Sequence, residues 1–244
     1  GECPKCGADD QYGDNCEVCG ATYSTTELKN ARSVVSGAIP IEKDSEHYFF
    51  DLPQFEKELK NWTQAGHLQE QVSNKLAEWF DQGLQQWDIS RDKPYFGFKI
   101  PGTEDKYFYV WLDAPIGYIS ATKEWAAQNN KDWKEYWQNE ETNLVHFIGK
   151  DNIVFHAIIF PILLKNHGDF ILPDNVPAYE FLNLEGDKFS TSRNWAVWLH
   201  EYIAAYPEKT DELKYVLTSI APETKDSEFT WKEFQTRVNS ELAD

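Results

Sequence analysis

Two Cys-x-x-Cys pairs near the start of the chain constrain its fold more than any other feature. Cys3 and Cys6 form the first pair, and Cys16 and Cys19 form the second pair nine residues further on. Each pair can place two thiolates on one metal ion. Zinc suits four thiolates because it accepts a closed tetrahedron and has no redox chemistry. All four ligands would be protein groups, so the metal would be structural and would leave no position for a catalytic water.

The alternative for these cysteines is two disulfides, but the sequence shows no leader for secretion and no other sign of an oxidising compartment. Residues 1–24 are polar and too few to build a core, so a bound metal would substitute for one. Gly7 and Gly20 follow the second cysteine of each pair and let backbone N–H groups turn toward sulfur. We call residues 1–24 the knuckle. Ribbons of this kind occur in many proteins, so the knuckle alone does not define a function.

Length and charge narrow the class of protein. The chain has 244 residues, enough for one large domain or two to three small ones, and it begins with glycine and contains no methionine, which predicts a fragment. The net charge of −18 argues against a stand-alone nucleic-acid binder, which usually carries a basic face. No apolar run of about 18 residues is present, so we predict no membrane span.

Hydrophobic spacing predicts helices in the first half of the chain. Apolar residues recur at helical spacing over 55–62 and again over 72–80. Pro53 fits the first turn of the first helix, and Gly83 can end the second. The segment 25–54 is predicted to be extended, and Trp87–Asp92 is predicted to be a loop with a turn at Ser90 or Asp92.

From Lys106 onward the pattern changes to alternating strands and helices. Predicted strands are Tyr107–Leu112, Asn143–Ile148 and Val176–Leu184, and they are separated by helices near Ile116–Gln128 and 152–165. The second helix is apolar all round and should be buried, with a kink at its proline. This order implies an α/β fold with a parallel sheet and right-handed crossovers. Three strands would make half of a doubly wound nucleotide-binding sheet.

Helical runs follow near 197–206, 211–220 and 231–242, with Thr210 or Asp211 and then Thr230 as N-cap candidates. Between the third strand and these helices lies Lys188-Phe189-Ser190-Thr191-Ser192-Arg193. A mobile loop with a lysine and hydroxyl groups can clamp negative charge on phosphates, and Gly186 supplies a hinge. Taken alone, the same string also fits a polar surface loop.

Two further segments carry candidate chemistry. Gly149-Lys150-Asp151 ends the second predicted strand and opens the buried helix, which is where a nucleotide meets a helix N-terminus in such sheets. Asp151 could accept hydrogen bonds from the ribose hydroxyls, or it could simply cap the helix. Trp111–Tyr118 and the aromatic residues of the buried helix are explained by core packing alone, and His156 by a satisfied core histidine.

Taken together, these segments carry a family resemblance. The hexapeptide at Lys188 resembles the Lys-Met-Ser-Lys-Ser loop of class I aminoacyl-tRNA synthetases. The knuckle and the aromatic segments narrow this resemblance to the methionyl-tRNA synthetase family. Trp87–Asp92 resembles the return from the family's connective insertion, and Asp226–Phe229 with the following residues resembles its stem-contact region. The family's His-Ile-Gly-His type motif is absent, so the chain resembles the second part of such an enzyme.

The resemblance implies a role for each matching residue. It implies catalytic roles for Lys188, Ser190, Thr191 and Ser192. Binding of ATP and the adenylate is implied for Gly149, Asp151, Lys188, Thr191 and Arg193. Binding of methionine is implied for Trp111, Pro115, Tyr118, Phe155, His156 and Phe160. The physical case for the last set is that a polarizable thioether gains from aromatic edges, while a tyrosine hydroxyl or a histidine distinguishes sulfur from a methylene.

The chain departs from the family pattern at three positions. Thr191 replaces the second lysine of the loop and Phe189 replaces its methionine, so Lys188 and Arg193 must carry more of the phosphate charge. Asn152 stands where bacterial relatives often have an apolar residue. Beyond Arg193 the chain has five basic residues against ten acidic ones, so most phosphate contacts to a bound tRNA must come from elsewhere.

The resemblance implies a cytoplasmic ligase that joins methionine to ATP as methionyl-adenylate and transfers it to tRNA(Met). Implied cofactors are a structural Zn²⁺ on the four cysteines and Mg²⁺ with ATP as substrate. Implied domains are a connective insertion with the knuckle (1–105), the second half of the catalytic sheet (106–193) and a helical stem-contact region (194–244). The fragment alone should be inactive. Two alternatives stay open: another class I synthetase, for an apolar or cysteine substrate, and a zinc-ribbon nucleic-acid module without catalysis.

Overall fold

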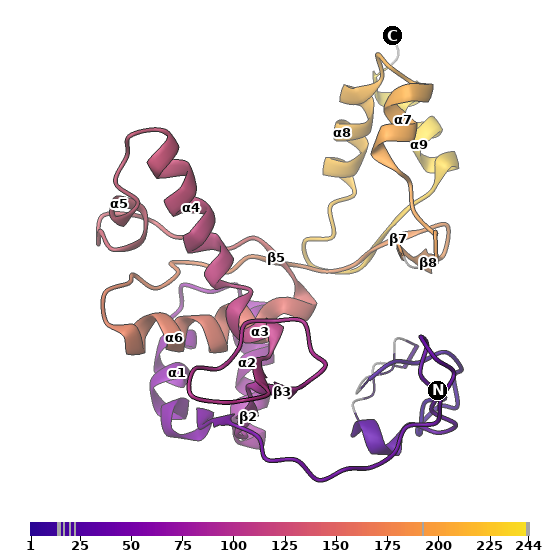
Figure 1. Cartoon of the computed structure of the whole chain (residues 1–244). Coiled ribbons are helices and arrows are strands. Elements are labelled where there is room, and N and C mark those ends of the chain that lie inside the picture. The colour runs from indigo at the N-terminus through magenta and orange to yellow at the C-terminus, as the bar shows by residue number, and fades with distance from the viewer. Residues whose placement is uncertain (14–15, 17, 20, 22, 192, 243–244) are drawn as a thin grey trace. The chain divides into compact units, whose positions relative to one another are not determined.

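A computed structural model describes residues 1–13, 16, 18–19, 21, 23–191 and 193–242 (Figure 1). The chain divides into two compact units, Gly1–His47 and Tyr48–Asp244, which we call the N-terminal unit and the main unit. Among the described residues, no helix combines the length and the apolar character that crossing a membrane requires. Ser192 and Gly20, for which the sequence predicts roles, lie outside the described residues.

The N-terminal unit has little regular structure and a very small core. Its one-turn helix η1 (Thr25–Glu27) begins at Ser24, where Ser24 and Glu27 form a reciprocal capping box. Among its described residues, the buried hydrophobic cluster consists of Cys3, Cys16 and Tyr23, packed by Ala8, Ala21 and Leu28. A core of this size cannot offset the conformational entropy of ordering the chain, which is why the cysteines matter for stability.

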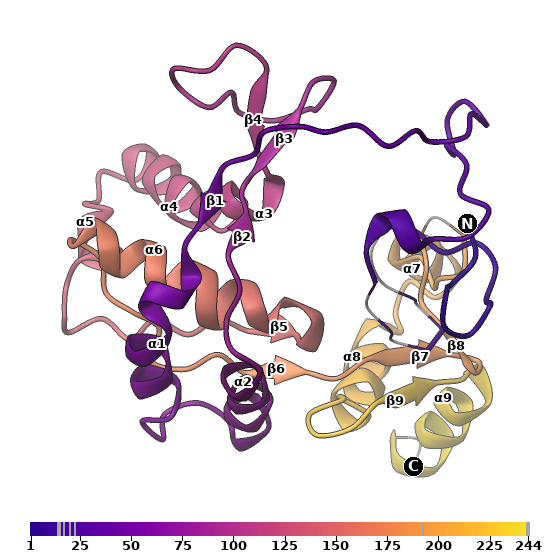
Figure 2. The same ribbon diagram turned by 90° about the horizontal axis from the view of Figure 1, so that it is seen from below.

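The predicted helices of the first half are confirmed. The one-turn helix η2 (Leu52–Phe55) leads into α1 (Glu56–Thr63), and α2 (Glu70–Gln82) ends at Gly83 with φ of +78°. Both helices share a buried apolar cluster with the helix that follows β5, and Figure 2 shows α1 and α2 next to α6 (Phe160–His167). The buried residues of this main core are Leu52, Leu59, Leu68, Val72, Leu76, Phe80, Ile153, Ala157, Ile158, Ile159, Ile162, Val176 and Ala178.

The prediction of a loop at Trp87–Asp92 is wrong. These residues form β2 (Trp87–Asp88), which pairs antiparallel with β1 (Phe49–Phe50), and β3 (Ser90–Asp92), which pairs antiparallel with β4 (Lys106–Phe108). Ser90 is fully buried, and its hydroxyl accepts a 2.9 Å hydrogen bond from the N–H of Tyr48. The partner strands lie far away in sequence, so local turn chemistry could not reveal them.

The strand predicted at Tyr107–Leu112 is also wrong beyond Phe108. The chain turns there into the short helix α3 (Val110–Asp113), in which Ala114 donates its N–H to the carbonyl of Val110 at 2.8 Å. A short apolar run does not distinguish a buried strand from a helix, and here the run is divided between the two. The first expected strand therefore belongs to an antiparallel pair and not to the parallel sheet.

Parallel pairing does occur in the two later predicted strands. β5 (Ile148–Gly149) pairs parallel with β6 (Ala178–Tyr179), extended by a parallel bridge between Val145 and Asn175. The predicted strand Val176–Leu184 is interrupted after β6, because Glu180 donates its N–H to the carbonyl of Pro222 at 2.8 Å. It resumes as β7 (Leu182–Leu184), which lies between antiparallel β8 (Asp187–Lys188) and parallel β9 (Ser227–Phe229).

Helices between these strands largely follow the predictions. α4 (Ile116–Gln128) has the predicted bounds and is followed by α5 (Lys134–Trp137). The predicted buried helix is built of the 3₁₀ turn η3 (Lys150–Asn152), the π-helical turn η4 (Phe155–Ile159) and α6 (Phe160–His167). The irregular π turn lies just before Pro161, which lacks the N–H that a regular helix needs there.

The last part of the chain packs around a second core of Leu184, Tyr202, Leu213, Val216 and Phe229. Its helices are α7 (Leu199–Ala205), α8 (Thr210–Ser219), α9 (Trp231–Arg237) and the π-helical turn η5 (Val238–Leu242). Thr230 caps α9 as predicted, since its hydroxyl accepts a 3.0 Å hydrogen bond from the N–H of Glu233. The other predicted caps are wrong: α8 begins after Lys209, without a side-chain cap.

Candidate active site and metal centre

The four cysteines meet in one cluster. No disulfide joins them, and their sulfur atoms all lie within 4.8 Å of one another. The Sγ atoms of Cys3 and Cys19 are 3.9 Å apart, and those of Cys6 and Cys16 are 3.7 Å apart. A tetrahedral ion with metal–sulfur bonds of about 2.3 Å places its ligands about 3.8 Å apart. The thiolates therefore fit a closed four-sulfur metal site, and the disulfide alternative is wrong.

Backbone N–H groups point at the sulfur atom of the first cysteine in each pair. Cys3 Sγ accepts hydrogen bonds of 3.4 Å from the N–H groups of Cys6 and Lys5, and Cys16 Sγ accepts one of 3.4 Å from Cys19. The bond from Cys6, with that from Lys5, lowers the pKa of Cys3 to about 6, although burial opposes this. The N–H groups of Cys6 and Lys5 thus stabilise the thiolate form of Cys3, which is the form that binds a metal.

In the main unit, Trp111 of α3 stacks on Phe155, the first residue of η4. Their ring centroids are 4.4 Å apart and their planes differ by 11°. Trp87 and Tyr109 extend this cluster. The ring centroid of Trp87 lies 6.3 Å from that of Phe155, with the rings tilted, and 6.0 Å from that of Tyr109, in an edge contact. β2, which the sequence did not predict, thus brings Trp87 to the same place as the buried helix.

Tyr118 of α4 and His156 of η4 are joined directly. The hydroxyl of Tyr118 lies 2.9 Å from Nε2 of His156, and Nδ1 of His156 lies 3.0 Å from the carbonyl oxygen of Asn152. Because a carbonyl can only accept, Nδ1 carries the proton, and Nε2 of the neutral ring accepts from Tyr118. Burial lowers the pKa of His156, although the bond to Asn152 opposes this, so the ring favours its neutral form.

A second buried histidine, His146, lies against this pair and was missed by the sequence analysis. Its ring centroid is 5.6 Å from that of Tyr118 and 5.5 Å from that of His156. Burial, together with repulsion from His156, lowers the pKa of His146 to about 4. The signal in the sequence is its place two residues before Ile148, where β5 begins. Alternate residues of a strand share a face, so His146 should point to the same side as Ile148. His146 and Tyr118 also line a cavity of about 240 Å³.

The turn Gly149–Asp151 stands where the sequence placed it, at the carboxyl end of β5 and the start of η3. A Cβ atom on Gly149 would lie 2.8 Å from Oδ1 of Asp151, so a side chain at this position would require the Asp151 carboxylate to move. Asp151 itself is exposed. The turn thus offers an accessible carboxylate at the end of a parallel strand.

Lys150, at the centre of this turn, bridges two acidic residues from distant segments. Its ammonium contacts the carboxylate of Glu180 and lies 2.7 Å from Oδ1 of Asp226. Asp226 also accepts a 2.9 Å hydrogen bond from the N–H of Phe181. Partial burial works against the charge, but the bonds to Asp226 and Glu180 outweigh it and raise the pKa of Lys150. The sequence analysis did not identify Glu180 or Phe181.

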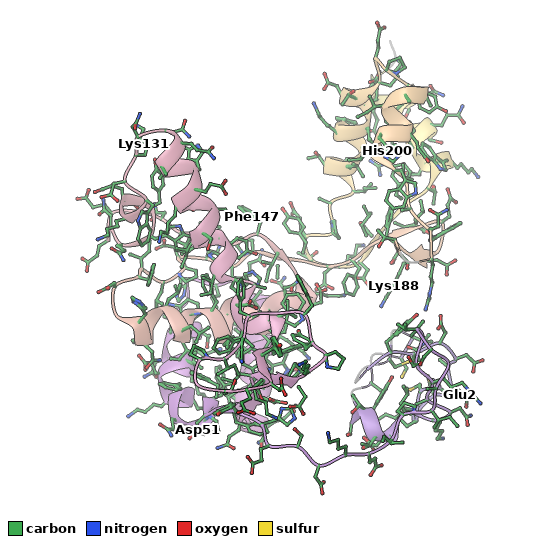
Figure 3. The ribbon with its side chains drawn as sticks, in the orientation of Figure 1. Glu2, Asp51, Lys131, Phe147, Lys188 and His200 are labelled. Atoms are coloured by element: carbon green, nitrogen blue, oxygen red, sulfur yellow. The ribbon has the colours of Figure 1, made fainter. Side chains whose placement is uncertain are left out.

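Lys188 lies in the β7–β8 hairpin, where Figure 3 labels it, and faces Asn183 across the strand pair. The two residues between the strands, Glu185 and Gly186, have positive φ values of 49° and 93°, as a tight hairpin turn requires. Gly186 therefore shapes the turn. Beyond the hairpin, Ser190 pairs with Trp195 by backbone hydrogen bonds of 2.9 Å in both directions, and its hydroxyl accepts from the N–H of Arg193 at 3.3 Å.

The described site residues predicted for the main unit fall into three clusters. Trp111, Phe155, Tyr118 and His156 are brought together by stacking and hydrogen bonding, as described above. Pro115 is buried at the start of α4. Phe160 is fully buried in a small core with Ile119, Trp137 and Leu164. Its ring centroid lies 6.3 Å from that of Tyr118. The Gly149 turn and the Lys188 hairpin form the other two clusters, and both approach Phe181.

The chain belongs to a known enzyme class. Residues 1–244 match the family model described as tRNA synthetases class I (M), so the chain is a member of that family. Among its most similar curated relatives are proteins called methionine–tRNA ligase: one from Christiangramia forsetii is 56% identical over 99% of this chain, and one from Flavobacterium psychrophilum is 55% identical over 100%. The chain spans 36% of the length of each relative.

Solved structures lead to the same family. A Mycobacterium tuberculosis methionyl-tRNA synthetase in complex with methionyl-adenylate superposes with a TM-score of 0.69 at 26% identity, covering 87% of this chain and 41% of that one. The apo form of that enzyme gives a TM-score of 0.66 at 25% identity over the same 87% of this chain. The α/β architecture with parallel strand pairing is thus shared with solved members of the family.

Proposed function

We propose that the chain is part of a methionine–tRNA ligase, which activates methionine with ATP and transfers it to tRNA(Met). Two contacts at adjacent residues of η4 carry the proposal. Trp111 stacks on Phe155, and the hydroxyl of Tyr118 forms a hydrogen bond with His156. Relatives at 56% and 55% identity that bear this name support it.

In this proposal the aromatic cluster binds the methionine side chain. The stacked rings of Trp111 and Phe155 offer edges and faces to a polarizable thioether, while the Tyr118–His156 pair supplies the polar contact. Pro115 and Phe160 contribute the surrounding wall. Since His156 is held neutral, it presents no charge to a neutral sulfur atom, which favours methionine over charged side chains.

The nucleotide would lie between the Gly149 turn and the Lys188 hairpin. The Asp151 carboxylate accepts hydrogen bonds from the ribose hydroxyls. The methionine carboxylate attacks the α-phosphorus of ATP, and the bond to pyrophosphate breaks. Negative charge grows on the leaving phosphates, where Lys188, Ser190, Thr191, Ser192 and Arg193 stabilise it, with Mg²⁺ accompanying ATP. The terminal tRNA hydroxyl then attacks the acyl carbonyl carbon and releases AMP.

We assign zinc to the four-cysteine cluster, because four thiolates at these spacings suit a closed tetrahedral site. The metal would hold the N-terminal unit folded without taking part in the reaction. We keep the predicted domains, with a connective insertion over 1–105, half of the catalytic sheet over 106–193 and a helical stem-contact region over 194–244. A cytoplasmic location also stays a prediction.

The remaining half of the catalytic sheet would dock on the free edge of β5. The N–H groups of His146 and Ile148 bond toward the β6 side, to Asn175 and Pro177. The alternate residues, Val145 and Phe147, are 41% and 70% exposed, and Figure 3 labels Phe147. The side chains of Val145 and Phe147 leave one face of this segment apolar and exposed, and the edge of β5 opposite β6 offers backbone groups to a partner strand. We therefore propose that the chain alone is inactive.

Pyrophosphate exchange tests the proposal. The full-length protein should exchange labelled pyrophosphate into ATP only when methionine is present, and a Lys188→Ala variant should lose most of this activity. Stimulation by another amino acid instead of methionine would support the neighbouring class I synthetases. The zinc-ribbon alternative predicts no exchange with any amino acid but salt-dependent binding of arbitrary RNA. Exchange by residues 1–244 alone at the full-length rate would contradict the proposal that the chain is inactive.

A further inference from the structure

Two lysines from different elements approach one aromatic ring. Nζ of Lys150, in the turn after β5, lies 4.3 Å from the ring centroid of Phe181, and Nζ of Lys188, in β8, lies 5.1 Å from it. Both distances are within the range of about 6 Å over which a ring attracts an ammonium group. Phe181 therefore connects the turn that carries the ribose-binding candidate with the hairpin that carries the phosphate-binding candidate.

The register of the hairpin explains why Phe181 meets Lys188. Lys188 stands opposite Asn183, and Phe181 precedes Asn183 by two residues. Residues two apart on a strand share a face, and diagonal neighbours across an antiparallel pair lie within reach of long side chains. The backbone of Phe181 is fixed on both sides: its N–H donates to Asp226 at 2.9 Å, and its carbonyl accepts from the N–H of Ser227 at 2.9 Å.

Charge around the ring favours a second ammonium group. Lys150 contacts two carboxylates, those of Glu180 and Asp226, so these three groups together carry one net negative charge. This charge and the negative face of the ring both attract Lys188. The lysine projects from an exposed hairpin, and attraction to the ring and to this charge narrows the rotamers that its four-carbon stem samples.

We propose that Phe181 is a positioning residue that holds the ammonium group of Lys188 beside the Gly149–Asp151 turn before the nucleotide binds. The inference rests on the proposed function and deepens it. A charge that is already in place when negative charge develops on the phosphates needs no reorganisation during the reaction, which raises the rate. Phe181 touches no reacting atom, so its effect must pass through Lys188.

The test uses the full-length protein and its methionine-dependent pyrophosphate exchange. Phe181→Leu keeps an apolar side chain but removes the ring, and it should lower kcat about three- to tenfold. The KM for methionine should stay unchanged, because the aromatic cluster is separate. Phe181→Tyr keeps the ring and should retain the wild-type kcat. Phe98→Leu is the matched control, since Phe98 is 71% exposed and lies outside the site.

A double-mutant cycle separates positioning from a structural role. In a Lys188→Ala background, Phe181→Leu should lower kcat by no more than about 1.5-fold, because the residue it positions is gone. An equal loss in both backgrounds would overturn the proposal, and so would a Phe181→Leu enzyme with wild-type kcat. If Phe181→Leu lowers the unfolding temperature, Phe181→Met takes its place in the same cycle. A wild-type protein without methionine-dependent exchange would overturn the proposed function, and this inference with it.

Discussion

His146 should make the stability of the main unit fall in mild acid. The residue is 8% exposed, and the pKa of His146, about 4, lies well below the ordinary value of 6.5. The unfolded chain therefore takes up a proton near pH 6.5, whereas the folded chain resists it until about pH 4. Stability from this group is present above pH 6.5 and is lost as the pH falls toward 4. Between pH 7 and pH 4.5 the loss is about 2 kcal/mol.

Urea unfolding can measure this loss by comparing wild type with two variants. Both variants remove the titrating imidazole, and their replacement side chains differ in shape. His146→Phe keeps a flat ring and His146→Asn keeps a polar group, but neither titrates in this range. The difference in unfolding free energy between wild type and each variant should change by about 2 kcal/mol between pH 7 and pH 4.5. Subtraction cancels the carboxylates, which titrate alike in all three proteins. Parallel curves for wild type and both variants would refute the reasoning.

Three further predictions concern the other clusters. Cys16→Ser, or a strong chelator, should unfold the N-terminal unit while leaving the main-unit transition in circular dichroism unchanged; one joint transition would contradict this. Tyr118→Phe should cost about 1–3 kcal/mol by leaving a buried nitrogen of His156 unpaired, and calorimetry should find Tyr136→Phe within about 0.5 kcal/mol of wild type. Asp226→Asn should lower urea stability by about 1 kcal/mol, a loss that should shrink in high salt.

Local spacing was enough to predict several parts of the fold. The cysteine pairs, the helices over 55–83, the helix Ile116–Gln128 and the cap at Thr230 all depend on residues a few positions apart. The Gly149 turn was placed correctly because a strand followed by a buried helix is also a local pattern. Spacing failed at Trp87–Asp92 and at Tyr107–Leu112, where pairing with a distant strand decided between loop, strand and helix.

The sequence by itself determined the pairing of the four cysteines, several of the helices and the family, because each is encoded in short-range pattern. Only the tertiary structure decided that Glu180 and Asp226 share Lys150, that Phe181 lies under two ammonium groups, and that His146 is buried against His156. These contacts join residues up to 76 positions apart. A titratable or aromatic side chain takes its properties from neighbours in space, and such neighbours leave no periodic trace along the chain.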